Sequence, residues 1–308
     1  VVGILRTGRP GHVVGLRADM DALPMQDEKD VPYRSQVPGV CHACGHDGHT
    51  AALLGAAKYC AAHRDQLCGT IKFVFQPAEE GHQSTYASVG QVLVKSGIAC
   101  AGGHAFKLTL TGVGTHAISP QDGSDVISTA MQIIDSWQSM LSRQIDPQQP
   151  VVLSVCSIHA GEMGATNVLP STAVFSGTIR TFNDPLRESI LKKMRQRAES
   201  ISKFNGCTCM MEEEYQFPVL VNHDAVTQIV KQAAVEVVGP NAVFTVPEPS
   251  IGSEDFAQYA QKIPASYFMF GVRNNEKGFV YGGHHPKFDM DEDGLLYDVE
   301  IFLHALRY

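Results

Sequence analysis

Strand and helix patterns alternate in the first hundred residues of this chain. Residues 12–24 read as a buried strand that ends in acidic residues, and residues 47–66 read as a helix with Asp47 as its N-cap. Residues 69–81 predict the next strand, and residues 85–97 predict an amphipathic helix. This order is typical of an α/β domain with a mostly parallel sheet, whose functional groups lie just past the carboxyl ends of strands.

The middle of the chain interrupts this alternation. Residues 106–217 predict the order β-α-β-β-α-β, with helices over residues 121–143 and 184–204, which is the ferredoxin-like split motif. The alternating style returns after residue 217. A chain of 308 residues is long enough for two domains. We therefore predict one domain from residues 1–105 and 218–308, with residues 106–217 inserted as a ferredoxin-like α+β domain.

Composition excludes several classes of partner. The net charge of −8 argues against nucleic acid and against anionic membrane surfaces. No apolar run approaches the roughly 18 residues that a membrane span needs. The eight cysteines are scattered rather than arranged as a disulfide framework, so we expect a reducing, cytoplasmic location. The chain opens directly on a strand pattern, and we expect the natural chain to extend further at this end.

Residues 39–50, GVCHACGHDGHT, crowd two cysteines and three histidines into one short segment. Cys44 and His46 are two positions apart, so they do not share a helix face, and we place them in the loop before the helix. One interpretation is a closed structural zinc site of Cys41, Cys44, His46 and His49, although its spacing is too short for a classical finger. The other interpretation is half of an open catalytic metal site that distant residues complete.

Further candidate ligands follow at other strand ends and loops. Glu79 and Glu80 end one strand pattern, His104 ends another, and His284 and His285 precede the last helix. The alternating geometry of an extended chain lets only one of the two adjacent histidines face a site, and position favours His284. Thiolate, imidazole and carboxylate ligands together suit zinc, manganese or cobalt-type ions. One glutamate could bind metal while the other activates water.

A set of motifs carries a family resemblance. The sequence resembles the aminoacylase/carboxypeptidase-type dinuclear metallohydrolases, and within them the amidohydrolase branch that holds hippurate hydrolase and indole-3-acetyl–amino acid hydrolases. The motifs run in family order across nearly the whole chain: LRADMDALP, CHACGHDGHTAALLGAAK, FVFQPAEEG, GVGTHA, NVLPSTAVFSGTIRTF, GSEDF and GGHHPKF.

The resemblance implies a reaction and a set of ligands. The reaction would be hydrolysis of the amide bond that joins an acyl group to an amino acid, releasing the free amino acid. Two divalent ions, zinc or manganese with cobalt and nickel as further candidates, would be held by Cys44, His46, Glu80, His104 and His284. Glu79 would be the general base, and Asp21 would orient a metal-binding imidazole.

The resemblance also assigns roles within the inserted domain. His116 would stabilise the tetrahedral oxyanion, and Asn167 and Arg180 would help to hold the substrate carboxylate. The domain would act as a lid that closes over the substrate and would pair two chains into a homodimer. Glu254 in GSEDF belongs to a family signature near the metals.

Some features depart from the family pattern. The family carries a longer N-terminal segment, an additional segment between His104 and Phe106, and a glycine-rich stretch after EEG where this chain has HQSTYAS. These departures concern substrate specificity more than reaction type. Two alternatives therefore stay open: a dipeptidase or aminopeptidase on the same scaffold, and a binding protein that has lost catalysis.

Overall fold

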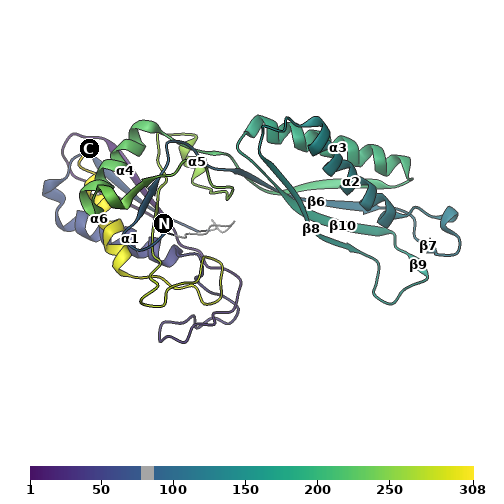
Figure 1. Cartoon of the computed structure of the whole chain (residues 1–308), viewed down its shortest axis with the longest axis horizontal. Coiled ribbons are helices and arrows are strands. Elements are labelled where there is room, and N and C mark those ends of the chain that lie inside the picture. Colours follow the sequence, from purple (N-terminus) through teal and green to yellow (C-terminus); the bar gives the residue numbers. More distant parts are fainter. Residues whose placement is uncertain (78–86) are drawn as a thin grey trace. The chain divides into compact units, whose positions relative to one another are not determined.

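The computed structural model describes residues 1–77 and 87–308 (Figure 1). The chain divides into two compact units. Unit 1 comprises residues Val1–Ala99, Val221–Pro249 and Glu254–Tyr308, and unit 2 comprises Cys100–Leu220 and Ser250–Ser253. The inserted unit therefore starts a few residues earlier than the expected position 106, and seven residues after 217, namely 218–220 and 250–253, also belong to it. Within the described ranges, no helix is long and apolar enough to cross a membrane.

Unit 1 contains short strands and four helices within its described residues. Its strands are β1 (Val2–Arg6), β2 (Val13–Asp19), β3 (Thr70–Gln76), β4 (Val92–Val94), β13 (Val243–Thr245) and β14 (Met269–Phe270), and its helices are α1 (His46–Ala62), α4 (Asp224–Val238), α5 (Ala257–Ala260) and α6 (Asp293–Ala305). Strands β5 (Gly97–Cys100) and β12 (Leu220–Asn222) lie where the chain passes from one unit to the other.

The described strands of unit 1 form mixed sheets. Strand β3 pairs with β2 in parallel and with β1 in antiparallel, and β4 pairs with β13 in parallel and with β14 in antiparallel. The prediction of a mostly parallel sheet is therefore wrong for the described residues. Strands β1 and β14 run in the opposite direction to β3 and β4, with which they pair. Antiparallel pairs of this kind do not need the crossover connection that a parallel pair needs.

The prediction of a helix over residues 85–97 is also wrong for residues 87–97, the part of this range that the structure describes. That part contains β4, whose Val92 and Val94 are buried while the residue between them is less so. Gly90 and Gly97 bound it with φ angles of 81° and 72°, which suit glycine. The β-branched valines fit a pleated strand better than a helix, and pairing with two strands decides between the patterns.

Unit 2 has the element order expected from the sequence. Its elements are β6 (Gly102–Thr111), β7 (Thr115–His116), α2 (Val126–Gln144), β8 (Val151–Ala160), β9 (Val168–Leu169), β10 (Thr172–Thr181), α3 (Asp184–Phe204) and β11 (Thr208–Phe217). The long strands form an antiparallel sheet in the order β11-β6-β10-β8. Helices α2 and α3 cover one of its faces (Figure 1). The β-α-β-β-α-β order is thereby confirmed.

The core of unit 2 lies between this sheet and its helices. Trp137 is fully buried there, with Phe106 edge-on at 5.4 Å between ring centroids and Phe175 at 5.5 Å. Its indole N–H donates to the carbonyl oxygen of Met194 at 3.1 Å, so the buried polar atom is satisfied. Unit 2 thus has a core of its own that can hold its loops in place.

Candidate metal centre

The ligand-rich segment, residues 39–50, leads into the first turn of α1 in unit 1. Gly45 is the N-cap residue, with a φ of 106°, and the helix begins at His46 with no side-chain cap. The prediction of Asp47 as the N-cap is therefore wrong, as is the placement of His46 before the helix. Glycine at position 45 permits the left-handed turn that leads directly into the helix.

Three side chains converge beside this turn. Asp19, His46 and His49 each present a possible ligand atom, and these atoms all lie within 4.8 Å of one another. Asp19 ends β2, and its Oδ1 lies 2.6 Å from Nδ1 of His49 while its Oδ2 lies 3.5 Å from Nε2 of His46. His46 and His49 are three residues apart, so the helix presents both on one face.

Asp21 contacts the His46 ring of this cluster from the side opposite to Asp19. Its Oδ1 lies 3.0 Å from Nδ1 of His46, which leaves Nε2 of the same ring directed toward Asp19. A carboxylate on one ring nitrogen fixes both the tautomer and the orientation of the imidazole. His46 is therefore held in one orientation, with its Nε2 among the possible ligand atoms.

His284 lies against the same segment through its backbone. Its N–H donates to the carbonyl oxygen of Ala43 at 2.6 Å, next to Cys44. His284 is the one residue other than glycine that has a positive φ, 65°, among the residues that the structure describes. Such a backbone is costly for a residue with a Cβ and persists where the surroundings hold it. The fold thus brings His284 next to the segment that holds Cys44 and His46, although it is far from them in sequence.

The predicted ligand Glu80 and the predicted base Glu79 lie outside the described residues.

The buried side chain of Arg17 contacts the Asp19 carboxylate of this cluster. Arg17 Nη1 lies 3.0 Å from Asp19 and 3.1 Å from Glu254, and Nη2 lies 2.6 Å from Asp255. Its Nε donates to Oε1 of Gln76 at 3.2 Å. Neither this arginine nor the position of Glu254 beside it was predicted from the sequence.

Burial and charge set the protonation of the cluster in opposite ways. Burial would raise the pKa of Asp19, but the His49 hydrogen bond and the charge of Arg17 hold it below its usual range. Burial lowers the pKa of His46, which favours the neutral imidazole that binds metals. Burial also opposes the charged form of His49, yet its bond to Asp19 raises its pKa. Burial raises the pKa of Asp298 on α6 to about 7.

His104 belongs to unit 2 and is fully buried on β6. Neither of its ring nitrogens makes a hydrogen bond within the described residues, and Nε2 lies 3.5 Å from Glu213. Burial, with a contribution from Arg187, lowers its pKa to about 4, so the ring is neutral at neutral pH. A buried neutral imidazole without hydrogen bonds is costly unless a further group binds it.

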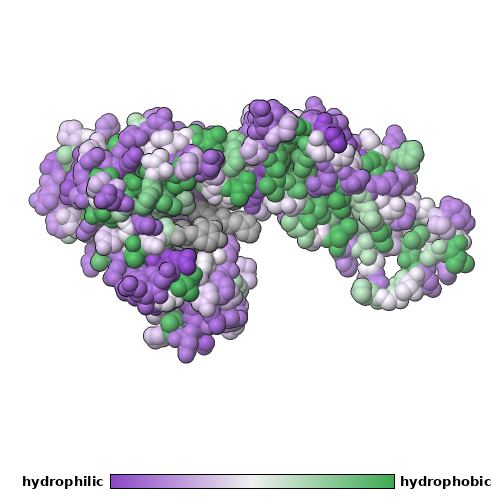
Figure 2. Space-filling view, viewed as in Figure 1, coloured by the Kyte–Doolittle hydropathy of each residue, from purple (hydrophilic) through white to green (hydrophobic). Residues whose placement is uncertain are grey.

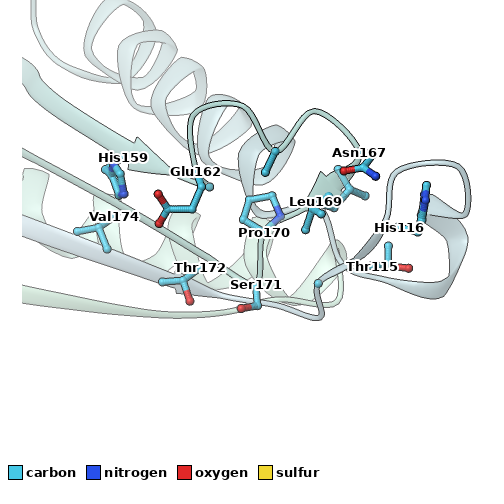
Figure 3. Close-up of a pocket in the computed structure, with 14 residues that line it drawn as sticks. Thr115, His116, His159, Glu162, Asn167, Leu169, Pro170, Ser171, Thr172 and Val174 are labelled. Carbon is cyan, nitrogen blue, oxygen red and sulfur yellow. The ribbon is translucent and has the colours of Figure 1, made fainter.

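His116 and Asn167 lie together in unit 2. Strand β7 pairs with β9, placing His116 opposite Val168, and the carbonyl oxygen of Asn167 accepts a hydrogen bond from Ala117 at 2.9 Å. Both line a cavity of about 710 Å³ whose other polar lining includes His159 and Glu162 (Figure 3). Figure 3 shows His116 and Asn167 toward one end and the other two toward the opposite end.

Arg180 is placed differently, on β10 and 6% exposed. Its Nη1 donates to the hydroxyl of Ser253. The Arg180 side chain also lies close to Gly103, and a Cβ added at Gly103 would be 2.6 Å from Nη1 of Arg180. Glycine at position 103 therefore makes room for the buried guanidinium.

Comparison with known proteins places this arrangement in a family. The model of peptidase family M20/M25/M40 matches residues 15–308. The chain belongs to this family. The resemblance inferred from the motifs is thereby confirmed, and with it the prediction of a metal-dependent amide hydrolase.

Individual relatives support the same assignment. Thermostable carboxypeptidase 2 of Saccharolobus solfataricus is 37% identical over 96% of this chain and 80% of its own length. N-acetyl-L-cysteine deacetylase of Bacillus subtilis is 35% identical over 93% of this chain and 72% of its own length. The crystal structure of YxeP from Bacillus subtilis, a dinuclear metal-binding peptidase from the M20 family, has 29% identity and a TM-score of 0.78, covering 99% of this chain and 83% of that one.

The residues of this family member fit divalent metal ions. The cluster on β2 and α1 offers imidazole and carboxylate atoms, with the thiol of Cys44 in the segment just before α1. His104 offers a buried neutral imidazole with no hydrogen bond in the described part of the chain. Mixed nitrogen, oxygen and sulfur ligands are those that zinc and neighbouring ions prefer.

The closed structural zinc site is overturned by the same geometry. In the described part of unit 1, the clustered ligand atoms come from Asp19, His46 and His49, and Cys41 is not among them. The Cys41 thiol instead interacts with Asp27, and its residue bridges to Leu23. From the sequence, Asp19 was expected only as an acidic residue at a strand end and His49 only as a member of the closed zinc site, so their meeting with His46 was not predicted. The signal was the i, i+3 spacing of HDGH at the start of a helix that follows an acidic strand end.

Proposed function

We propose that this M20 family member hydrolyses N-acyl amino acids, cleaving the amide between an acyl or aryl-acyl group and the amino acid. The observation that carries this proposal is the convergence of Asp19, His46 and His49, with Asp21 behind His46, in a chain of this family. The names of the relatives support the substrate class. A deacetylase of N-acetyl-L-cysteine and a hydrolase of IAA–amino acids both act on an acylated amino acid. A carboxypeptidase likewise cleaves an amide next to a free carboxylate.

The proposed ligands of two divalent ions are Cys44, His46, Glu80, His104 and His284. When bound, such ions act as Lewis acids on the amide carbonyl and make water more acidic. Glu79 accepts the proton of the attacking water and returns it to the leaving amine. Asp21 holds the His46 ring through Nδ1, 3.0 Å away. We propose zinc or manganese as the ions, with cobalt or nickel able to replace them.

The inserted unit supplies the remaining proposed groups. His116 donates a hydrogen bond to the oxyanion that develops on the carbonyl carbon. Asn167 and Arg180 recognise the substrate carboxylate, for which a planar guanidinium is suited. The adjoining positions of His116 and Asn167 support a joint role for these two side chains.

A homodimer through the inserted unit is also proposed. Strand β8 is an edge of the unit 2 sheet, and Val152 and Ile158 on it are 40% and 52% exposed. Figure 2 shows hydrophobic residues gathered over the strands of this sheet. An exposed edge strand with apolar side chains is a ready pairing surface. The cysteines, all of which are free thiols, support a reducing compartment such as the cytoplasm.

The test is a hydrolysis screen of the purified chain. N-acetyl, N-benzoyl and indole-acetyl amino acids are compared with dipeptides, with manganese or zinc added. The proposal predicts that N-acyl amino acids are hydrolysed faster than dipeptides. It also predicts that a chelator removes the activity and that added metal restores it.

Metal content, measured on the same preparation, separates the alternatives. Two ions per chain with turnover support the enzyme. Faster cleavage of dipeptides with a free α-amine would favour a dipeptidase or aminopeptidase. No turnover on any substrate, with no bound metal, would favour a binding protein on a hydrolase scaffold.

A further inference from the structure

Arg17 lies at the centre of a buried charged network in unit 1. Its side chain is 6% exposed, and the three carboxylates around it are 2%, 0% and 14% exposed for Asp19, Glu254 and Asp255. All three lie within 3.1 Å of guanidinium nitrogens. An arginine in such surroundings is a poor source of net stability, because desolvation offsets most of the ionic attraction. Its main effect is therefore to fix the positions of the groups around it.

That geometry joins three separate segments of the chain. Asp19 ends β2, two residues before Asp21. Gln76 ends β3, three residues before Glu79, and accepts from Nε of Arg17 at 3.2 Å. Asp255 lies in the GSEDF motif and accepts from both Arg17 and Gln76. The guanidinium therefore holds the ends of β2 and β3, from which the carboxylates of the proposed site continue.

The contact with Asp19 carries this constraint to the histidines. Asp19 uses Oδ2 toward Arg17 at 3.0 Å and Oδ1 toward His49 at 2.6 Å. The same Oδ2 is 3.5 Å from Nε2 of His46. Without the arginine, three buried carboxylates would face one another with no cation from β2 between them. The Asp19 carboxylate would then be held by His49 through Oδ1 alone, and its Oδ2 could turn away from His46.

We propose that Arg17 is a positioning residue for the metal centre: its guanidinium fixes the end of β3 and the Asp19 carboxylate that faces Nε2 of His46, while Asp21 orients the same ring through Nδ1. The inference rests on the proposed function in that it assumes His46 to be a ligand. It goes further by giving a role to a side chain that touches neither metal nor substrate.

The planar fork of arginine is central to this role. Three of its nitrogens contact four acceptor groups in different directions, which a single ammonium group cannot do. Arg17→Lys keeps the charge and loses the fork. Arg17→Met removes both charge and fork while keeping an unbranched stem. Arg6→Lys and Arg6→Met are matched controls, because Arg6 is exposed on β1 of the same sheet.

The experiment titrates the metal-free chain with Co²⁺ and records affinity and the visible absorption spectrum. Circular dichroism first establishes the folded fraction, to which the spectra are normalised. We expect Arg17→Lys to fold, to bind Co²⁺ roughly 10–100-fold more weakly, and to shift the Co²⁺ bands, as loss of an outer ligand contact does. The Arg6 variants should match wild type in both readouts.

Wild-type affinity and an unchanged spectrum in folded Arg17→Lys would overturn the inference, whatever Arg17→Met does. If Arg17→Met fails to fold, Arg17→Lys alone decides. The outcome is separable from the proposed function. A wild-type chain that binds Co²⁺ but hydrolyses no N-acyl amino acid would refute the function while the Arg17 comparison still stands. Normal hydrolysis with unaffected Arg17→Lys would refute only the inference.

Discussion

Glu79 and Glu80 are chemically identical neighbours, yet the proposed mechanism gives them separate tasks. We expect Glu79→Gln to lower turnover by about 10²–10⁴-fold, the usual contribution of a general base, with the metal content unchanged. Glu80→Gln should instead lower the metal content, because an amide is a weaker ligand than a carboxylate. Steady-state kinetics and metal analysis of the same samples check both.

Glu300→Gln is the control for these substitutions, since Glu300 is exposed on α6. Equal turnover in Glu79→Gln and wild type would remove Glu79 from its assigned role. Loss of metal from Glu79→Gln would make it a ligand rather than a base.

Asp298 provides a second prediction at the residue scale. Burial raises its pKa from 3.8 to about 7, and its Oδ1 has no hydrogen-bond partner within the described residues. A folded-state pKa above the unfolded value means that the neutral carboxyl is stabilising relative to the charged one. This contribution is fully present below about pH 4 and is lost as the pH rises through 7.

Asp298→Asn should therefore become progressively more favourable than wild type between pH 4 and pH 7. The difference in the free energy of unfolding should grow by up to about 4 kcal/mol, at about 1.4 kcal/mol per unit of pKa shift. Urea unfolding of the metal-free chain at several pH values measures it. A difference that does not vary with pH would show that Asp298 is already ionised in the fold.

At the scale of elements, the start of α2 is capped more strongly than that of α4. Asp125 accepts from the N–H groups of Ile127 and Ser128 at 2.9 and 3.0 Å, whereas His223 before α4 makes no side-chain cap. We expect Asp125→Ala to lower the free energy of unfolding by about 1 kcal/mol. His223→Ala should change it by only a few tenths. Thermal unfolding of both variants checks the contrast, and equal shifts would contradict it.

The whole molecule is the scale at which the proposed dimer is tested. Ile158→Asp places a charge on the exposed edge strand β8 and should shift the chain from dimer to monomer in light scattering. Met210→Asp is the control, since Met210 is 58% exposed on β11, the opposite edge of the same sheet. A dimer that survives Ile158→Asp but not Met210→Asp would move the interface to β11.

Local patterns in the sequence determined a large part of this protein. Residues 184–204 match α3 to the residue, and the β-α-β-β-α-β order of unit 2 follows from periodicity alone. The ligand-rich segment and the glutamate pair mark metal chemistry because those residue types are rarely combined otherwise. Motif order was enough to indicate the family that the comparison then showed.

Only the tertiary structure decided the rest. Whether Val92 and Val94 form a strand or a helix depends on the neighbouring strands β13 and β14, which no local pattern contains. The meeting of Asp19 with His49 and the burial of Arg17 among three carboxylates join residues up to 238 positions apart. Propensity and spacing act over a few residues, whereas packing and charge pairing act through space, so the contacts that shape the candidate site could be read only from the fold.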